Sequence, residues 1–174
     1  MAALLLDKNN STSNLASFNG FADVLLPLGF KFSFNGGVSV SQSEAIGTAN
    51  PLYGQYAVSG GSIGRSQSMY WSYTLQQILT WNYTFNDVHN VDVMLGHENN
   101  YDMGRSLSGN KNGLYSVDSS ELSQGLKVSS TSSSFAEYNN EGYLFRGQYD
   151  FDNRLFFSAS YRRDASSRFH PDHR

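Results

Sequence analysis

Several features that define other protein classes are missing from this chain of 174 residues. It has no cysteine, which excludes a disulfide framework and thiolate chemistry. It has no run of about 18 apolar residues, so the sequence predicts no transmembrane helix. Charged residues make up only 16% of the chain, and its net charge of -3 argues against a nucleic-acid binder, which usually carries a basic stripe. The apolar start of the chain is too short for a signal peptide.

Aromatic and small polar residues are abundant instead. Aromatic residues reach 14% of the chain, with 11 Tyr and 12 Phe, and Gly occurs 16 times alongside many Ser and Asn. A chain with so many aromatic residues does not have the composition of a disordered protein. The combination of few charges, many aromatic residues and many small polar residues indicates a folded protein in which a polar surface alternates with an apolar one.

An alternation of apolar and polar residues with period two is the dominant pattern, and no helical period competes with it. Between residues 30 and 41 the even positions are Phe, Val or Gly and the odd positions are mostly polar. Between residues 68 and 85 the odd positions are mostly aromatic or apolar. The sequence predicts an all-β fold, an antiparallel meander of about six long strands that forms an open fragment of a transmembrane β-barrel. The strands are expected at about residues 15–26, 30–41, 68–85, 89–98, 143–151 and 154–164.

The predicted connections alternate between short and long. Residues 27–29, 86–88 and 152–153 have the Pro, Gly, Asn and Asp content of tight turns. Residues 42–67 and 99–142 are long polar stretches, which we expect to be disordered extracellular loops. Because successive connections of a meander lie at opposite ends, all the short turns would lie at one end, as in outer-membrane barrels.

The aromatic residues are spaced as two membrane girdles would require. Trp71 and Trp81 share a face ten residues apart, which is about 33 Å along a strand and roughly 23 Å along the membrane normal at a tilt of about 45°. That distance matches the apolar band of an outer-membrane barrel, about 25 Å tall. Gln77 lies between the two tryptophans on the same face, and the sequence does not explain why a polar residue stands there. The predicted girdle residues are Trp71, Tyr73, Trp81, Tyr83, Phe85, Tyr143 and Phe151.

The opposite face of the last two predicted strands is polar and is expected to line the lumen of the barrel. There it would contact an internal plug or a polar solute. These predicted lumen-facing residues are Arg146, Gln148, Asp150, Ser158, Ser160, Arg162 and Asp164.

Soluble folds are the main alternative, because the strands of a β-sandwich also alternate. Sandwich strands usually have about 5–6 residues, however, and the pattern at 68–85 is about three times longer. A secreted β-rich carbohydrate-binding module, with Tyr and Trp as stacking platforms for sugars, therefore remains the second hypothesis. Girdles at two depths would favour the barrel, and one exposed aromatic cluster would favour the sugar-binding module.

Four segments resemble the SusC/RagA family of TonB-linked outer-membrane proteins. Residues 141–154 resemble one of its barrel hairpins, and residues 160–174 resemble a signature of that family, with Ala165 where the family typically has Gly. Residues 89–98 are similar to a strand that ends in Gly-His-Glu, and residues 50–56 resemble an extracellular loop.

This resemblance implies a TonB-dependent receptor, a transporter of about 22 strands with a plug in its barrel. Such proteins import oligosaccharides or peptides across the outer membrane with a SusD-like lipoprotein and TonB. The chain matches only part of the barrel wall and has no plug domain. Since bacterial barrels need at least about eight strands, we expect a fragment of a larger barrel. The missing signal peptide would then mark a truncated start.

No motif in the sequence predicts catalysis, a cofactor or a metal site. His97-Glu98 begins like a zinc-protease motif, but Tyr101 stands where its second His is needed. The segment 170–173 contains two His and one Asp, but a metal site needs three or four convergent ligands, so a solvated loop is favoured. We therefore expect a transport protein and not an enzyme.

Overall fold

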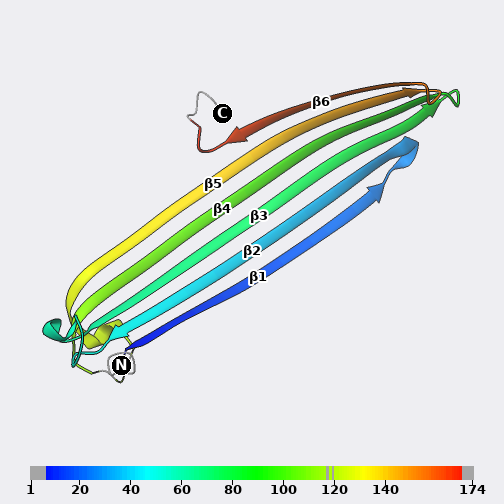
Figure 1. The fold of residues 1–174 in the computed structure, drawn as a ribbon. Helices are drawn as coiled ribbons and strands as arrows, with labels where there is room; N and C mark the ends of the chain where they lie inside the picture. Colours follow the sequence, from blue (N-terminus) through cyan, green and yellow to red (C-terminus); the bar gives the residue numbers. More distant parts are fainter. Residues whose placement is uncertain (1–6, 117, 119, 170–174) are drawn as a thin grey trace. The chain divides into compact units, whose positions relative to one another are not determined.

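The computed structural model describes residues 7–116, 118 and 120–169, and these form one sheet of six strands. The strands are adjacent in chain order, with β1 and β6 at the two edges (Figure 1). Their bounds are β1 (Lys8–Leu25), β2 (Phe30–Ala49), β3 (Ser62–Phe85), β4 (His89–Leu114), β5 (Gly125–Phe151) and β6 (Leu155–Ser166). Three short 3-10 turns are η1 (Pro27–Gly29), η2 (Ala57–Ser59) and η3 (Leu122–Gln124). The predicted fold class, an antiparallel meander of six long strands, is confirmed.

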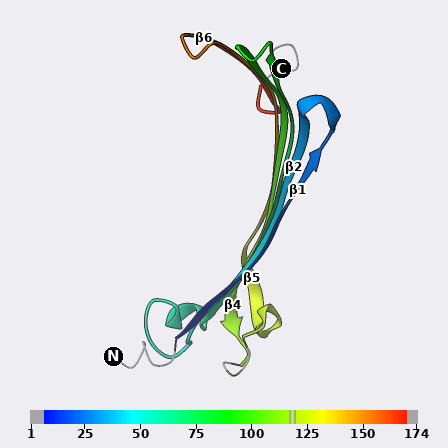
Figure 2. The ribbon, with the colours of Figure 1, turned by 90° about the vertical axis from the view of Figure 1, so that its right-hand side faces the viewer.

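The described residues fall into two compact units. The first lies within residues 1–16, 40–71 and 103–136, and the second within residues 17–39, 72–102 and 137–174. The strands of each unit form a single layer (Figure 2). Across the described part of the chain, Ile63 of the first unit is the only buried hydrophobic side chain of the core. Nothing in a single layer can bury its apolar face, so that face requires a partner of another kind.

The strands extend well into the two stretches that the sequence predicted as loops. In place of loops at 42–67 and 99–142, the connections are residues 50–61 and 115–124. The prediction was wrong because both faces are polar there, so the alternation that marks a strand disappears while the backbone still pairs. The Ser-rich run at 129–134 lies within β5.

Polar side chains bond across strands in the first unit. Ser13 Oγ lies 2.9 Å from Ser43 Oγ, and Ser106 Oγ lies 2.7 Å from Ser134 Oγ. Asn110 Nδ2 donates to Ser130 Oγ over 3.0 Å. Short hydroxyl and amide side chains thus supply cross-strand contacts where apolar pairs are missing.

Ion pairs also link the strands of the first unit to one of its connections. Arg65 on β3 forms ion pairs with Glu44 on β2 and with Glu121, which directly precedes η3. These two carboxylates raise the pKa of the Arg65 guanidinium. One residue on β3 therefore joins a neighbouring strand and the connection between β4 and β5.

The connection that follows β2 is held by Asp7 and Asn50. Asp7 Oδ1 accepts hydrogen bonds from the backbone N–H of Asn50 over 2.9 Å and from its side-chain amide over 2.7 Å. These donors lower the pKa of Asp7 from its ordinary value of 3.8. Asn50 Oδ1 in turn accepts from the backbone N–H groups of Leu52 and Tyr53, each at 2.9 Å. The start of the connection is therefore ordered by side-chain caps.

The short turns of the second unit have the geometry that their residues predicted. Asn86 and Asp87 have φ of 49° and 60°, and Asp152 and Asn153 have φ of 50° and 55°. Two consecutive residues with positive φ define a type I′ hairpin turn, which Asn and Asp tolerate. All three short turns belong to the second unit and both longer connections to the first. Among the described residues, no helix is long and apolar enough to cross a membrane.

Candidate functional site: two contrasting faces of the second unit

The register of β5 and β6 places the predicted lumen residues on one face of one hairpin. Arg146 pairs with Ser160 and Gln148 pairs with Ser158. Because side chains alternate along a strand, the even-numbered residues of both strands share this face. The members so placed are Arg146, Gln148, Asp150, Ser158, Ser160, Arg162 and Asp164.

Three members of this set have partners within the hairpin. Arg162 Nε lies 2.8 Å from both carboxylate oxygens of Asp164. Gly142 is opposite Asp164, and a Cβ at that position would lie 2.8 Å from Asp164 Oδ1, so the absence of a side chain leaves room for the ion pair. Asp150 Oδ1 accepts a hydrogen bond of 2.9 Å from the backbone N–H of Asn153 and thereby supports the turn.

A hydrogen-bonded chain that the sequence did not predict crosses three further strands. Asn35 Nδ2 on β2 donates to Gln76 Oε1 on β3 over 3.4 Å, and Gln76 Nε2 donates to Glu98 Oε2 on β4 over 3.0 Å. Asn100 Nδ2 donates to the other oxygen of Glu98 over 2.8 Å. Alternation along each strand could have placed these residues on one face of the sheet. Their contact could not be predicted, because the register between the predicted strand 30–41 and its neighbours was unknown.

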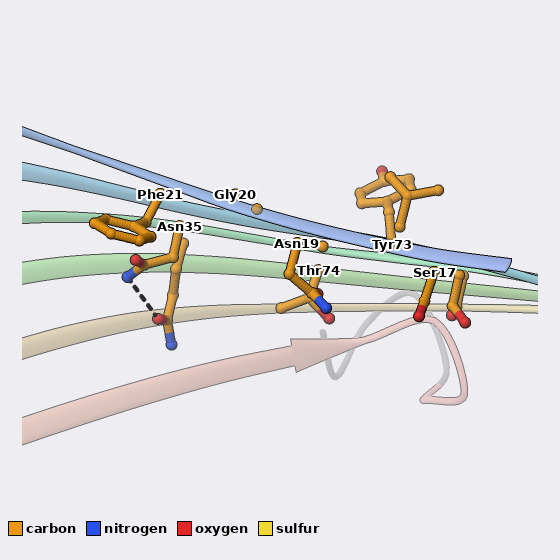
Figure 3. A pocket seen from close by; sticks show the side chains of 13 residues that line it. Ser17, Asn19, Gly20, Phe21, Asn35, Tyr73 and Thr74 are labelled. Atoms are coloured by element: carbon orange, nitrogen blue, oxygen red, sulfur yellow. Dashed lines mark hydrogen bonds between the residues drawn. The ribbon is translucent and has the colours of Figure 1, made fainter.

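A groove of about 550 Å³ adjoins this chain on β1, β2 and β3 (Figure 3). Its lining contains no charged side chain. Hydroxyl and amide groups from Ser17, Asn19 and Thr74 line it, and the ring of Phe21 lies beside Asn35. Such a surface offers hydrogen bonds and one aromatic contact to an uncharged polar molecule or to a polar protein segment.

Aromatic residues gather beside the short turns on the other face. The ring of Trp81 lies 5.9 Å from those of Phe30 and Tyr83 and 6.4 Å from that of Phe85. Trp81 Nε1 also donates to the backbone oxygen of Leu28 over 2.9 Å. Three predicted girdle residues, Trp81, Tyr83 and Phe85, therefore form one cluster.

The other predicted girdle residues lie in separate contacts. Phe151 contacts the ring of His89 at 5.1 Å, and Tyr73 stacks on Tyr101 at 5.5 Å. Tyr143 lies 4.9 Å from the ring of His97. Trp71 belongs to the first unit, whereas Tyr73 belongs to the second.

The presence of Gln77 on the apolar face is explained by a second chain of hydrogen-bonded side chains. His97 Nδ1 lies 2.6 Å from Gln77 Oε1, and His97 Nε2 lies 3.0 Å from Glu141 Oε1. Tyr143 Oη donates to the same Glu141 oxygen over 2.7 Å. Sequence analysis did not predict the contact of His97 with Glu141. Their odd positions on β4 and β5, which place both on the apolar face, were the available signal.

Within the described ranges, no three His, Cys, Asp or Glu side chains converge as metal ligands would. His97 and Glu98, which begin like a zinc-protease motif, are consecutive residues of β4 and therefore point to opposite faces of the sheet. Residues 170–173, with the two His considered above, lie outside the described residues.

A single-layer meander with one polar and one apolar face, short turns and long strands defines an open wall segment of a transmembrane β-barrel. The fold of the chain is similar to that of three solved structures of one transporter. The RagAB peptide transporter matches with a TM-score of 0.88 and 23% identity, over 97% of this chain and 19% of that chain.

The RagAB peptide importer in the "closed-closed" state matches with the same TM-score, identity and coverage. In the "open-open" state it matches with a TM-score of 0.81 and 24% identity, over 95% of this chain and 18% of that chain. No protein-family model and no curated protein matches the sequence. The chain thus spans about a fifth of the length of the transporter chains whose fold it shares.

Proposed function

We propose that this chain forms part of the wall of a TonB-dependent, SusC/RagA-like importer in the cell outer membrane. The observation that carries the proposal is the likeness of 97% of the chain to a peptide transporter at a TM-score of 0.88. The resemblance of residues 89–98 and 141–154 to this family, noted from the sequence alone, supports the same conclusion independently. Because the neighbouring structures are transporters, we expect transport and no enzymatic reaction.

In this function the two faces of the second unit have different surroundings. The apolar face contacts membrane lipid, with Trp81, Tyr83, Phe85 and Phe151 near one interface and Tyr73 and Tyr143 towards the other. Trp71, which shares a face of β3 with Tyr73 but belongs to the first unit, is proposed as a girdle residue as well. The polar face, with Arg146, Arg162 and Asp164, lines the lumen and contacts the plug of the complete barrel.

The transported solute is proposed to be a bulky polar nutrient, an oligosaccharide or a peptide. RagAB is a peptide transporter, which favours peptides. The uncharged groove beside Asn35 and Gln76 is compatible with either class, because both present many hydroxyl or amide groups. A SusD-like lipoprotein and TonB are the partners that the family resemblance implies, and the two-component name RagAB supports a second protein.

The absence of cysteine makes the topology testable by single-cysteine labelling. Val58→Cys places a thiol at a connection where the side chain is 99% exposed. Arg154→Cys places one beside a short turn, and Leu95→Cys places one on the apolar face, where Leu95 is 51% exposed. A membrane-impermeant maleimide should label Val58→Cys in intact cells and Arg154→Cys only after the outer membrane is permeabilised. Leu95→Cys should be labelled only after unfolding.

The second hypothesis, a secreted carbohydrate-binding module, predicts a different result. All three cysteines of a soluble module would be labelled equally, and the protein would be recovered without detergent. Equal labelling would overturn the membrane proposal. The single-layer sheet and the separate aromatic contacts of the second unit favour the barrel over one exposed sugar-stacking cluster.

A further inference from the structure

The first unit contains a groove of about 500 Å³, and the residues that line it come from β1, β2, β3 and β4. Among these described residues there is no aromatic side chain, and most are small or carry an amide or a hydroxyl group. Arg65 is the one charged residue of this lining, and its guanidinium is already paired with Glu44 and Glu121. The groove therefore offers neutral hydrogen-bonding groups rather than a free charge.

Two glycines lie in the middle of this groove, Gly47 on β2 and Gly64 on β3. A glycine within a strand often marks a place where a ligand or another backbone approaches closely. A Cβ at Gly47 would lie 3.0 Å from Asn9 Oδ1, and a Cβ at Gly64 would overlap Asn110 Oδ1. The amides of Asn9 and Asn110 thus lean over the two glycines from the flanking strands β1 and β4.

Both amides have hydrogen-bonding capacity to spare. Within the described part of the chain, the side chain of Asn9 has no hydrogen-bond partner. Asn110 uses Nδ2 to donate to Ser130 Oγ over 3.0 Å, which leaves its Oδ1 available as an acceptor. Because side chains alternate along a strand, hydroxyl groups two residues away share the face of the amides and the glycines. These hydroxyl groups belong to Ser11, Ser66 and Ser108.

We propose that this groove binds the backbone of an extended peptide, supplied by the transported solute. A carboxamide carries both a carbonyl acceptor and N–H donors, so Asn9 can pair with the N–H and the C=O of a peptide. The missing side chains at Gly47 and Gly64 let that backbone approach the sheet. Because these contacts involve the main chain alone, the groove accepts peptides of different sequence. A sugar ring would find hydrogen bonds here but no aromatic side chain on which to stack. This inference rests on the proposed function, because it requires a solute to enter the barrel.

Isothermal titration calorimetry of the complete protein, purified in mild detergent from the outer-membrane fraction, tests this site. The probe is a short peptide of alternating Ala and Ser with both ends blocked, so that it carries no charge. An analogue with N-methylated backbone amides should bind at least about tenfold more weakly, because its N–H donors are lost. A peptide with Thr in place of Ser should bind with the same affinity, because the groove contacts the main chain.

Two variants locate the binding in the groove. Asn9→Ala removes an amide that bonds to none of the described residues, and it should weaken binding about three- to tenfold, as expected for one neutral hydrogen bond. Gly64→Ala displaces the amide of Asn110 and fills the middle of the groove, so it should abolish binding. Gly104→Ala is the matched control on β4, because a Cβ there meets nothing within 4 Å. It should leave the affinity unchanged.

Several results would overturn the peptide site. No binding of the peptide, or equal affinity for its N-methylated analogue, would mean that the groove does not recognise a backbone. Unchanged affinity in both Asn9→Ala and Gly64→Ala, or an equal loss in Gly104→Ala, would place the binding elsewhere. Displacement of the peptide by a neutral oligosaccharide at equal concentration would mean that the groove selects hydroxyl groups. Recovery of the protein outside the membrane fraction would instead refute the proposed function, so the two failures are distinguishable.

Discussion

The imidazole Nδ1 of His97 lies 2.6 Å from Oε1 of Gln77, on the face that the sequence predicts to contact lipid. This contact gives the glutamine amide a partner on the neighbouring strand. Glu141 bonds to the other ring nitrogen of His97 over 3.0 Å. The histidine therefore joins Gln77 on β3 to Glu141 on β5.

Substitution of this link should destabilise the fold. His97→Ala leaves Gln77 and Glu141 without their shared partner, and an unsatisfied polar group on an apolar face costs about 1–3 kcal/mol. The measurement is the free energy of unfolding in detergent micelles with urea. A double-mutant cycle of Gln77→Leu and His97→Leu should give a coupling of about 0.5–3 kcal/mol. Additive effects of the two substitutions would contradict the contact.

Gly29 should tolerate no side chain. It has a φ of +82°, and a Cβ at this position would lie 2.1 Å from the backbone oxygen of Asn82. Gly54 has a similar φ of +88° but open space around it. Gly54→Ala should therefore cost only the left-handed strain of about 1–2 kcal/mol. Gly29→Ala should cost that strain plus an overpacking penalty of about 1–3 kcal/mol.

Comparison of the two alanine variants by their unfolding midpoints isolates the steric part of this effect. The backbone strain is nearly the same at both positions, so only the clash with Asn82 differs. Equal midpoints would show that the turn at η1 can move away from β3.

The backbone amides of the connection at residues 50–56 should lose protection from hydrogen exchange in acid. The pKa of Asp7 is lowered by the two donors of Asn50, so its carboxylate stabilises the folded state at pH values above 3.8. This contribution is lost as the pH falls through the lowered value in the folded state. Hydrogen exchange at residues 50–56, corrected for the intrinsic rate, should be unchanged between about pH 5 and 8 and should accelerate below about pH 4.

Asp7→Asn is the control for the acid effect. Its side chain does not titrate, so exchange at residues 50–56 should be faster than in the original chain at neutral pH and should not change further in acid. A pH dependence that persists in Asp7→Asn would assign the effect to another group.

Arg65 should contribute stability that depends on salt. Its ion pairs with Glu44 and Glu121 are partly exposed, so solvent and salt weaken them. Arg65→Gln should lower the free energy of unfolding measurably at low salt and by less at about 1 M salt, where screening is strong. Arg154→Gln removes an ion pair to Asp152 in which the arginine side chain is 81% exposed, and it should have almost no effect.

The sequence predicted most of the second unit correctly because the evidence for it is local. Alternation along residues 68–85 marks a strand with two different faces, and Asn86-Asp87 marks a type I′ turn. Neither inference depends on which strands are neighbours. The lengths of β1 to β5 were underestimated because strand segments that are rich in Ser and Asn and polar on both faces have no periodic signal.

What the sequence by itself determined is the number of strands, the short turns, and which residues share the apolar face of each strand. These properties follow from backbone alternation and from the φ angles that Asn, Asp and Gly accept. Only the tertiary structure decided which side chains meet, because a contact such as Gln77 with His97 and Glu141 depends on the register of three strands. A shift of one residue in that register would place each of these side chains on the other face. The polar chain on the apolar face therefore became visible only once the strands were paired.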